Sequence, residues 1–416
     1  MKTSVIQLTL DLLNGADMTV ALEFNPFLRD YQQNPHGYYR TMRNEAPAYY
    51  IEPLNVWALF RYDDVVDTLR RPDLYSSRDW IRNTLGEYDP VPQVTNLIAM
   101  DPPDHTRIRK LANKAFLPGV IRKMEGDIRA LIEELLDEVQ DRGREFDFVH
   151  DYAAHVPVNV TAKILGADER TARNEFKRWT MDLLRAPSRS VLPQEDLDQI
   201  KRSMTELREY FTELIEFRRR NPGNDLVSVL VQAEEDSQAL TADEILSLAF
   251  ILQFGGSETP SHLISSSLLN LFDHPDAMAA VKADPAKTAD AVIDETFRYS
   301  SPVHFVSRTA TQDIEIHGQT IPKDSIVMAY ISSANRDETV IEDPDTFDIT
   351  RKGNSRHLAL GLGTHYCLGA LLGKMMCGTA LTRALERMPS LQPIHETPEW
   401  MPSYWVRGLN TFPVRY

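Results

Sequence analysis

The chain has 416 residues, with 45 lysines and arginines against 61 aspartates and glutamates, and a formal net charge of −16. An acidic chain of this kind is a poor partner for nucleic acid or an anionic membrane surface, so we exclude both as general partners. No charged segment followed by an apolar one opens the sequence, and no signal peptide is expected. The most apolar stretch, residues 245–256, is too short to span a bilayer.

The two cysteines, Cys367 and Cys377, provide no disulfide framework, so a reducing cytoplasm is the expected location. The length by itself favours two or three domains. However, the sequence has no Gly/Ser run, Pro-rich spacer or repeat that would act as a linker, so we expect one unit over residues 1–416.

Strand-like segments come first along the chain, at residues 48–61, and return at residues 307–330 with turns at His317-Gly318 and Pro322-Lys323. Between and after them, apolar residues recur at helical spacing in residues 128–139, 199–219, 242–273 and 289–298. We therefore predict a mainly α fold with small β-sheets. A β-rich lobe is expected from about residues 48–62 and 303–330, and the remainder is expected to be α-rich.

The longest predicted helix opens with a capping box, in which Thr241 is the N-cap and Glu244 the third helical residue. It should run for about 30 residues, or about 45 Å. Its middle reads Gly255-Gly256-Ser257-Glu258-Thr259-Pro260, which is a poor helix sequence. Pro260 lacks the amide that would bond the carbonyl of Gly256, so a local opening is expected, and the glycines would admit a flat group. A simple kink is the alternative.

The second unusual segment runs from His357 to Gly369 and precedes a helical run at residues 370–385. Gly361 and Gly363 permit a tight loop with positive φ. Cys367 would then lie at a helix N-terminus, where free amides stabilise a thiolate and tune a bound metal.

Two other interpretations of these cysteines stay open. An isolated cysteine is commonly a small buried hydrophobe, and Cys377, within the following helix, fits that interpretation. A zinc site built from His357, His365 and Cys367 lacks a fourth ligand and the usual paired spacing.

Five segments together resemble the cytochrome P-450 family, in its order and spacing. The loop from Leu360 to Gly369 looks like the haem-binding signature, and residues 255–259 look like the oxygen-activation motif. Residues 101–109 resemble the segment that holds a haem propionate. Glu295 and Arg298, with Arg351 in a later segment, resemble the Glu-x-x-Arg pair and the arginine that completes it.

This resemblance implies a P-450 fold with haem b between the long central helix and the helix of the cysteine loop. Cys367 would ligate the iron. The other residues implied around the haem are His105, Arg109, Gly256, Arg308, His365 and Gly369. Glu258 and Thr259 would form an acid–alcohol pair that delivers protons, with Thr259 holding a water in the helix opening. A solvated helix face is the alternative for that pair.

The resemblance further implies a monomeric monooxygenase that inserts one oxygen atom from O2 into a lipophilic molecule. Rival activities are a peroxide-using or non-oxygenating haem-thiolate enzyme, and a haem-based ligand sensor. Glu295, Arg298 and Arg351 are expected to be structural. Two positions depart from the family's pattern: Leu360 stands where Phe is usual, and Gly373-Lys374 stand where Ala-Arg is common. Neither departure removes a chemical group that the reaction needs.

The variable walls of the family's pocket map to residues 78–98, 183–192, 248–253, 303–306 and 404–406. From these walls, the expected substrate-pocket residues are Asn96, Leu97, Leu252, Gln253, His304, Phe305 and Trp405. Their mixture of apolar and polar side chains suits a lipophilic molecule with a few oxygens, such as a terpenoid, polyketide, macrolide or fatty acid.

An electron donor is also expected, since no reductase domain is appended. At about 100° per residue, His105 and Arg109 share one helix face, while Arg107, Lys110 and Lys114 lie on the opposite face. We interpret these three, with Lys374, as a docking site for an acidic ferredoxin or flavodoxin. A solvated charged face is the alternative.

Overall fold

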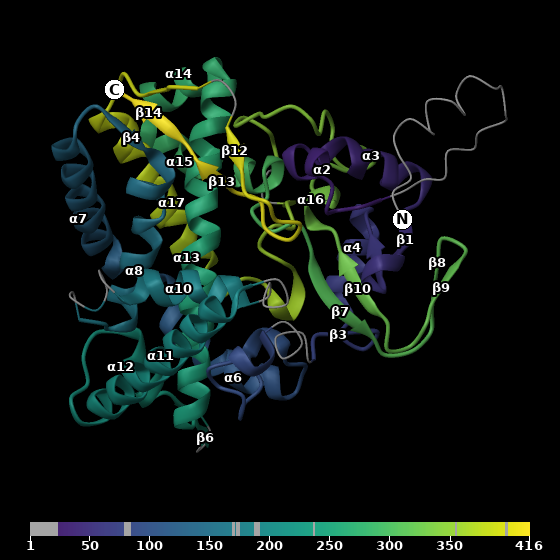
Figure 1. Ribbon diagram of the computed structural model, residues 1–416, viewed down its shortest axis with the longest axis horizontal. Helices are drawn as coiled ribbons and strands as arrows, with labels where there is room; N and C mark the ends of the chain where they lie inside the picture. The colour runs from purple at the N-terminus through teal and green to yellow at the C-terminus, as the bar shows by residue number, and fades with distance from the viewer. Residues whose placement is uncertain are drawn as a thin grey trace.

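The structure is a computed structural model, and it describes residues 24–78, 85–168, 171, 175–186, 192–235, 238–353, 356–395 and 398–416. Helices dominate it, as predicted (Figure 1). Those on the N-terminal side are α2 (Arg29–Gln33), α3 (His36–Glu45), α4 (Tyr62–Arg70), α6 (Asp104–Asn113), α7 (Pro118–Arg142) and α8 (His155–Leu165). They are followed by α10 (Lys177–Arg185), α11 (Gln194–Arg220), α12 (Leu226–Gln232), α13 (Ala242–Asp273), α14 (Pro275–Ala283), α15 (Pro285–Tyr299), α16 (Ile331–Ala334) and α17 (Ala370–Arg387).

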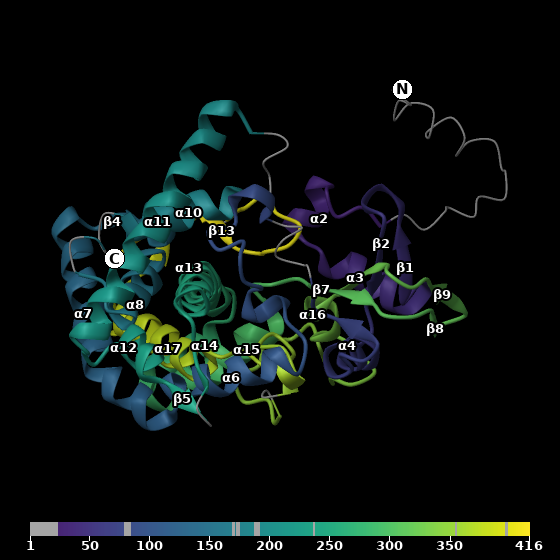
Figure 2. The ribbon, with the colours of Figure 1, turned by 90° about the horizontal axis from the view of Figure 1, so that it is seen from below.

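Helix α13 is the axis of the helical part, and Figure 2 views it end-on with the other helices around it. It packs against α8, α11, α15 and α17. The predicted capping box is confirmed: the amide of Thr241 donates to Glu244 Oε2 at 2.8 Å, and the amide of Glu244 donates to Thr241 Oγ1 at 3.2 Å. Because other helices surround α13, nearly all of its faces must be apolar. This explains why its sequence does not alternate between one apolar face and one polar face.

The strands predicted in residues 48–61 and 307–330 are confirmed and meet in one sheet of order β1-β2-β10-β7-β3. Its strands are β1 (Ala48–Ile51), β2 (Val56–Leu59), β3 (Tyr75–Ser76), β7 (Val306–Ala310) and β10 (Ile326–Ala329). The hairpin of β8 (Ile314–Ile316) and β9 (Gln319–Ile321) turns at His317 and Gly318, both at positive φ, as its sequence predicts.

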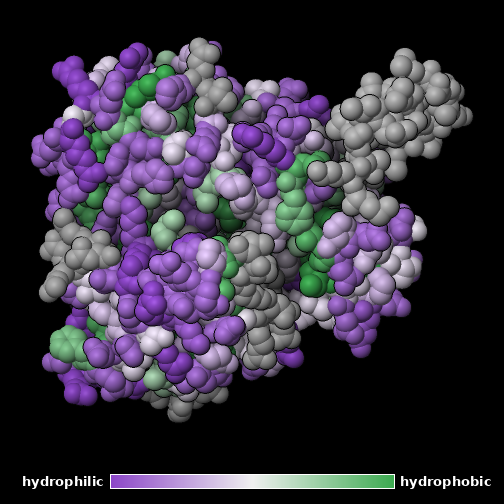
Figure 3. Space-filling model, in the orientation of Figure 1, coloured by the Kyte–Doolittle hydropathy of each residue, from purple (hydrophilic) through white to green (hydrophobic). Residues whose placement is uncertain are grey.

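Smaller sheets join the C-terminal strands to the helical part. They contain β4 (Glu145–Asp147), β11 (Gln392–Pro393), β12 (Glu399–Trp400), β13 (Leu409–Thr411) and β14 (Pro413–Arg415). The face shown in Figure 3 is mostly hydrophilic, with a hydrophobic strip beside β7 and β10. Within the described ranges, no helix combines the length and apolar character needed to cross a membrane.

A buried ion-pair network fixes the segment that leads to the cysteine loop. Glu295 is fully buried, and its carboxylate accepts from Arg298 at 2.7 and 2.8 Å and from the amide of Asp348 at 2.8 Å. Arg351 lies 3.5 Å from the same carboxylate. Arg298 also donates to the carbonyls of Pro344 and Thr346, at 2.7 and 2.8 Å. The network therefore ties α15 to the segment around residues 343–351.

Candidate active site

A cavity of about 380 Å³ lies between the middle of α13 and the start of α17, with Cys367 in its wall. The residues that the resemblance implied around the haem all line it: His105, Arg109, Gly256, Arg308, His365, Cys367 and Gly369. Glu258 and Thr259 line it from α13. These residues come from four separate parts of the chain, so the tertiary structure has assembled them into a single site.

The cysteine loop has the tight turns predicted for it. Gly361 and Gly363 have φ of 71° and 67°. A side chain at Gly363 would also crowd the carbonyl of Leu69, which would lie 3.0 Å from its Cβ. The amide of Cys367 donates to the carbonyl of Leu360 at 2.8 Å, which fixes the cysteine backbone. The Cys367 side chain is thereby open to the cavity.

The predicted stabilisation of a thiolate at Cys367 is only partly correct. Its N-terminal position does matter, because the amide of Gly369 and the charge of Arg109 favour the charged form. Burial is the larger effect, however, and it raises the pKa of the Cys367 thiol. A cation bound at the sulfur would favour the thiolate further.

The middle of α13 remains helical through Pro260, so the predicted opening is absent. Two threonine hydroxyls bond carbonyls of this turn, and that of Thr161 replaces the bond that Pro260 cannot make. Thr161 of α8 donates to the carbonyl of Gly256 at 3.2 Å, and Thr259 donates to the carbonyl of Gly255 at 2.8 Å. A Cβ at Gly255 would meet nothing within 4 Å, so its backbone is open to a flat group, as predicted. A Cβ at Gly256 would lie 3.0 Å from Thr161 Oγ1, so the second glycine is packed against α8.

Part of the cavity wall, around Arg308, His105 and His365, is suited to an anion. Arg308 is buried, and among the described residues no carboxylate lies within 4 Å of its guanidinium. Its burial lowers its pKa to about 10. His105 is 2% exposed, its Nε2 has no hydrogen-bond partner, and its ring lies 4.4 Å from that of His365. Buried cations and unpaired donors of this kind are satisfied by carboxylates.

Comparison with known proteins identifies this site. Residues 21–411 match the cytochrome P-450 family. The chain belongs to the cytochrome P-450 family. It is 36% identical over 324 residues to 6-deoxyerythronolide B hydroxylase of Saccharopolyspora erythraea, which covers 77% of this chain and 78% of the relative.

Solved structures give the same result. CYP109Q5 from Chondromyces apiculatus has a TM-score of 0.87 at 33% identity, covering 94% of this chain and 97% of that one. CYP109E1 from Bacillus megaterium, solved with testosterone, has a TM-score of 0.82 at 32% identity, covering 92% and 99%. This P-450 is accordingly an oxidoreductase of the monooxygenase type that uses haem b.

The residues present fit that cofactor. A thiol in the cavity wall suits the iron, an open glycine backbone suits the flat ring, and Arg308 with His105 suits the propionates. Leu360, where the family usually has Phe, lines the same cavity. The zinc interpretation is wrong, since no group of three metal-ligating side chains occurs within the described ranges. His357 instead lies 3.7 Å from Asp294 and stacks on Phe297.

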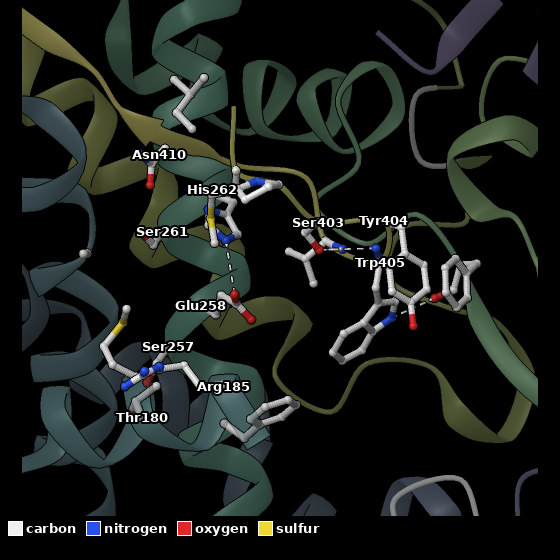
Figure 4. Close-up of a pocket in the computed structure, with 18 of the residues that line it drawn as sticks. Thr180, Arg185, Ser257, Glu258, Ser261, His262, Ser403, Tyr404, Trp405 and Asn410 are labelled. Carbon is white, nitrogen blue, oxygen red and sulfur yellow. Dashed lines mark hydrogen bonds and ion pairs between the residues drawn. The ribbon is translucent and has the colours of Figure 1, made fainter. Parts of the chain in front are cut away.

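A second cavity, of about 850 Å³, adjoins the first. Six of the described residues line both cavities: Phe254, Glu258, Ser307, Arg308, Trp405 and Val406. Figure 4 shows that its two sides differ in character. Glu258, Ser261, His262 and Asn410 lie on one side, and Tyr404 and Trp405 lie on the other. The larger cavity of the P-450 is therefore amphipathic, with a polar wall along α13.

The structure divides the predicted pocket residues. Leu97, Leu252, Phe305 and Trp405 line one or both cavities, and parts of the predicted walls, residues 79–84 and 187–191, lie outside the described residues. Asn96, Gln253 and His304 were wrongly assigned to the pocket: each faces the interior and is at most 5% exposed.

Internal hydrogen bonds explain these three exceptions. Asn96 accepts from the amide of Ile98 at 3.2 Å. Gln253 donates to Thr180 at 2.8 Å, which joins α13 to α10. His304 bonds the Tyr39 hydroxyl, and burial lowers its pKa to about 3. Each of the three side chains thus has at least one partner within the protein, although Gln253 Oε1 has none among the described residues.

The basic residues predicted to dock an electron donor have partners within the chain that the sequence did not indicate. Arg107 pairs with Glu244 at the start of α13, and Lys374 pairs with Asp294 at 2.5 Å. Lys110 and Lys114 also have interactions within the chain. Arg107 and Lys374 are paired because acidic residues of distant segments, Glu244 and Asp294, lie next to them. The distribution of charges on a single helix could not predict these partners.

Sequence reasoning missed Thr161, His262 and Gly408. Thr161 supplies the hydrogen bond that Pro260 removes from Gly256. His262 lies 3.5 Å from Glu258, four residues later on α13, and its ring rests on Gly408. The i, i+4 spacing of Glu258 and His262 was a signal in the sequence. The contacts from Thr161 and Gly408 had no local signal.

Proposed function

We propose that this P-450 inserts one oxygen atom from O2 into a lipophilic small molecule that carries a few oxygens. The observation that carries the proposal is the 850 Å³ cavity, which adjoins the cysteine cavity at Phe254, Glu258 and Trp405. Its volume is within the usual range for sites of drug-sized ligands. Its polar wall along α13 suits ligand oxygens, and its aromatic wall suits an apolar skeleton.

We assign Cys367 as the iron ligand and Arg308, His105, Arg109 and His365 as the residues that hold the propionates. A haem iron with a thiolate ligand supplies the activation of O2, because the thiolate pushes electron density toward the distal side. Arg308 gains a counter-charge when a propionate binds, which offsets the cost of its burial.

We assign Glu258 and Thr259 to proton delivery. Glu258 lines both cavities, so its carboxylate can take a proton from water on the side of the large cavity. Thr259, the next residue, lines the cysteine cavity and donates to the carbonyl of Gly255. It therefore presents its hydroxyl oxygen as an acceptor on the cofactor side, and this pair favours monooxygenation over a peroxide-using or sensing role.

The substrate classes that we propose are a terpenoid, a polyketide or macrolide, or a fatty acid. The relative from Saccharopolyspora erythraea is named as a hydroxylase of 6-deoxyerythronolide B, and the Bacillus megaterium enzyme was solved with testosterone. Electrons would come from a separate ferredoxin or flavodoxin. The proposed docking residues are Arg107, Lys110, Lys114 and Lys374, and the double substitution Lys110→Glu/Lys114→Glu should slow reduction and weaken its dependence on salt. We propose a cytoplasmic monomer.

Titration of the ferric protein tests the proposal. We would follow the Soret band during addition of 6-deoxyerythronolide B, testosterone or hexadecanoic acid. A low-to-high-spin shift with one ligand identifies its class, and turnover under ¹⁸O2 should then place one labelled atom in the product. Cys367→Ser should lose the thiolate spectrum. A haem spectrum without thiolate character in the unsubstituted protein would refute the assignment of Cys367.

A further inference from the structure

Glu258 lies at the boundary between the two cavities. It is the only carboxylate among the described residues that line either of them. Its side chain is 14% exposed, and the one ion-pair partner found for it within the described ranges is His262. His262 Nε2 lies 3.5 Å from Glu258 Oε1, as the dashed line in Figure 4 marks.

His262 depends on that carboxylate in turn. Its side chain is 6% exposed, and neither ring nitrogen has a hydrogen-bond partner. A buried polar nitrogen without a partner destabilises a protein. The Glu258 carboxylate, 3.5 Å from Nε2, is the polar group that offsets part of this cost by electrostatic attraction. Its position one helical turn before His262 places the two side chains on the same face of α13.

The opposite side of the His262 ring rests on the backbone of Gly408, just before β13. A Cβ at position 408 would overlap Nδ1, Cε1 and Cγ of the ring. Gly408 therefore makes the space that lets the ring lie flat and point Nε2 at Glu258. Residues 146 positions apart along the chain thus define the orientation of His262.

A restraint on Glu258 is needed because cations line the large cavity. Lys177 and Arg185 of α10 face it, as do Arg78 and His150. Arg185 already pairs with Asp196, and Arg78 lies 3.6 Å from Asp101. Lys177 has His155 at 3.3 Å, and no carboxylate within 4 Å among the described residues. Arg308 lines both cavities and likewise has no carboxylate within 4 Å among the described residues. Lys177 and Arg308 would both attract an unrestrained Glu258 carboxylate, so its position would not be fixed.

We propose that His262 is a positioning residue that holds the Glu258 carboxylate at the boundary of the two cavities. The proposal rests on the proton-delivery function of Glu258 and Thr259. A proton passes from water in the large cavity to the Glu258 carboxylate, and from the resulting acid toward Thr259, which restores the carboxylate. His262 neither gains nor loses a proton in this sequence, so it acts through the position of Glu258.

Three substitutions test the proposal. His262→Phe keeps the packing on Gly408 but removes the nitrogens, His262→Gln keeps a donor for Glu258, and Gly408→Ala displaces the ring without changing it. The assay measures peroxide released per NADPH consumed, with whichever of 6-deoxyerythronolide B, testosterone and hexadecanoic acid gives the largest Soret shift. We expect His262→Phe and Gly408→Ala to raise this ratio several-fold, toward the value for Glu258→Gln, and His262→Gln to stay within about twofold of the unsubstituted protein.

A second readout does not depend on turnover. In thermal unfolding of the ferric protein, His262→Phe and Glu258→Gln should each lower Tm, and the double variant should lower it by less than their sum. Additive Tm shifts would overturn the pairing. An unchanged peroxide ratio in His262→Phe, with high ratios in Glu258→Gln and Thr259→Ala, would overturn the role of His262 alone. Unchanged ratios in Glu258→Gln and Thr259→Ala would instead overturn the proton-delivery function.

Discussion

Replacing Glu295 by Gln removes the charge from a fully buried carboxylate while keeping its shape. In the folded protein this carboxylate accepts three hydrogen bonds of 2.7–2.8 Å and lies 3.5 Å from Arg351. The amide keeps one acceptor oxygen, so part of the network survives. It leaves Arg298, which is 2% exposed, without its counter-charge. Breaking a buried pair in this way costs about 3–5 kcal/mol, and we expect the free energy of unfolding to fall by that amount.

Urea unfolding of the ferric protein, followed by far-UV circular dichroism and by the Soret band, measures this loss. Glu133→Gln is the matched control, since Glu133 also pairs with two arginines, Arg383 and Arg387, but its side chain is 28% exposed. Partly exposed pairs of this kind are worth about 0–1 kcal/mol. A loss in Glu295→Gln no larger than that in Glu133→Gln would refute the structural role assigned to the network.

Three further outcomes are expected. Thr161→Val should cost about 1–3 kcal/mol by leaving the Gly256 carbonyl unpaired, and Thr161→Ser should restore most of it in the same urea assay. Buried His304 stays neutral down to its pKa of about 3, whereas the unfolded chain is protonated below about 6.5, so stability falls as the pH is lowered. Between pH 7 and pH 5, the free energy of unfolding of the unsubstituted protein should therefore fall by about 2 kcal/mol more than that of the His304→Asn variant. Arg308→Gln should stabilise the haem-free protein, because it removes a buried charge that has no carboxylate partner among the described residues. The same substitution should speed the transfer of haem to apomyoglobin at least about tenfold, because the propionate loses its counter-charge. Slower transfer would contradict the propionate assignment.

The sequence by itself determined the features that short segments can encode. The capping box of Thr241 and Glu244 fixes where α13 begins, because both partners lie within one turn. The turns at Gly361 and Gly363 follow from the positive φ that glycine adopts without strain. The same holds for the pairing of Glu295 with Arg298, three residues apart on a helix. These local geometries, in the order of the cytochrome P-450 family, were enough to indicate the cysteine ligand and the long helix.

Only the tertiary structure decided which polar side chains face a cavity and which partners they have. Gln253 and His304 lie in segments that border the pocket, but each bonds a partner from a distant segment, Thr180 and Tyr39 respectively. Asn96 instead caps its own short helix through the amide of Ile98.

The same is true of partners that lie far apart along the chain. Arg107 meets Glu244, Thr161 bonds Gly256, and Gly408 makes room for His262. Contacts between distant segments depend on how whole helices and strands pack, and that packing is the sum of many small interactions that no single segment encodes.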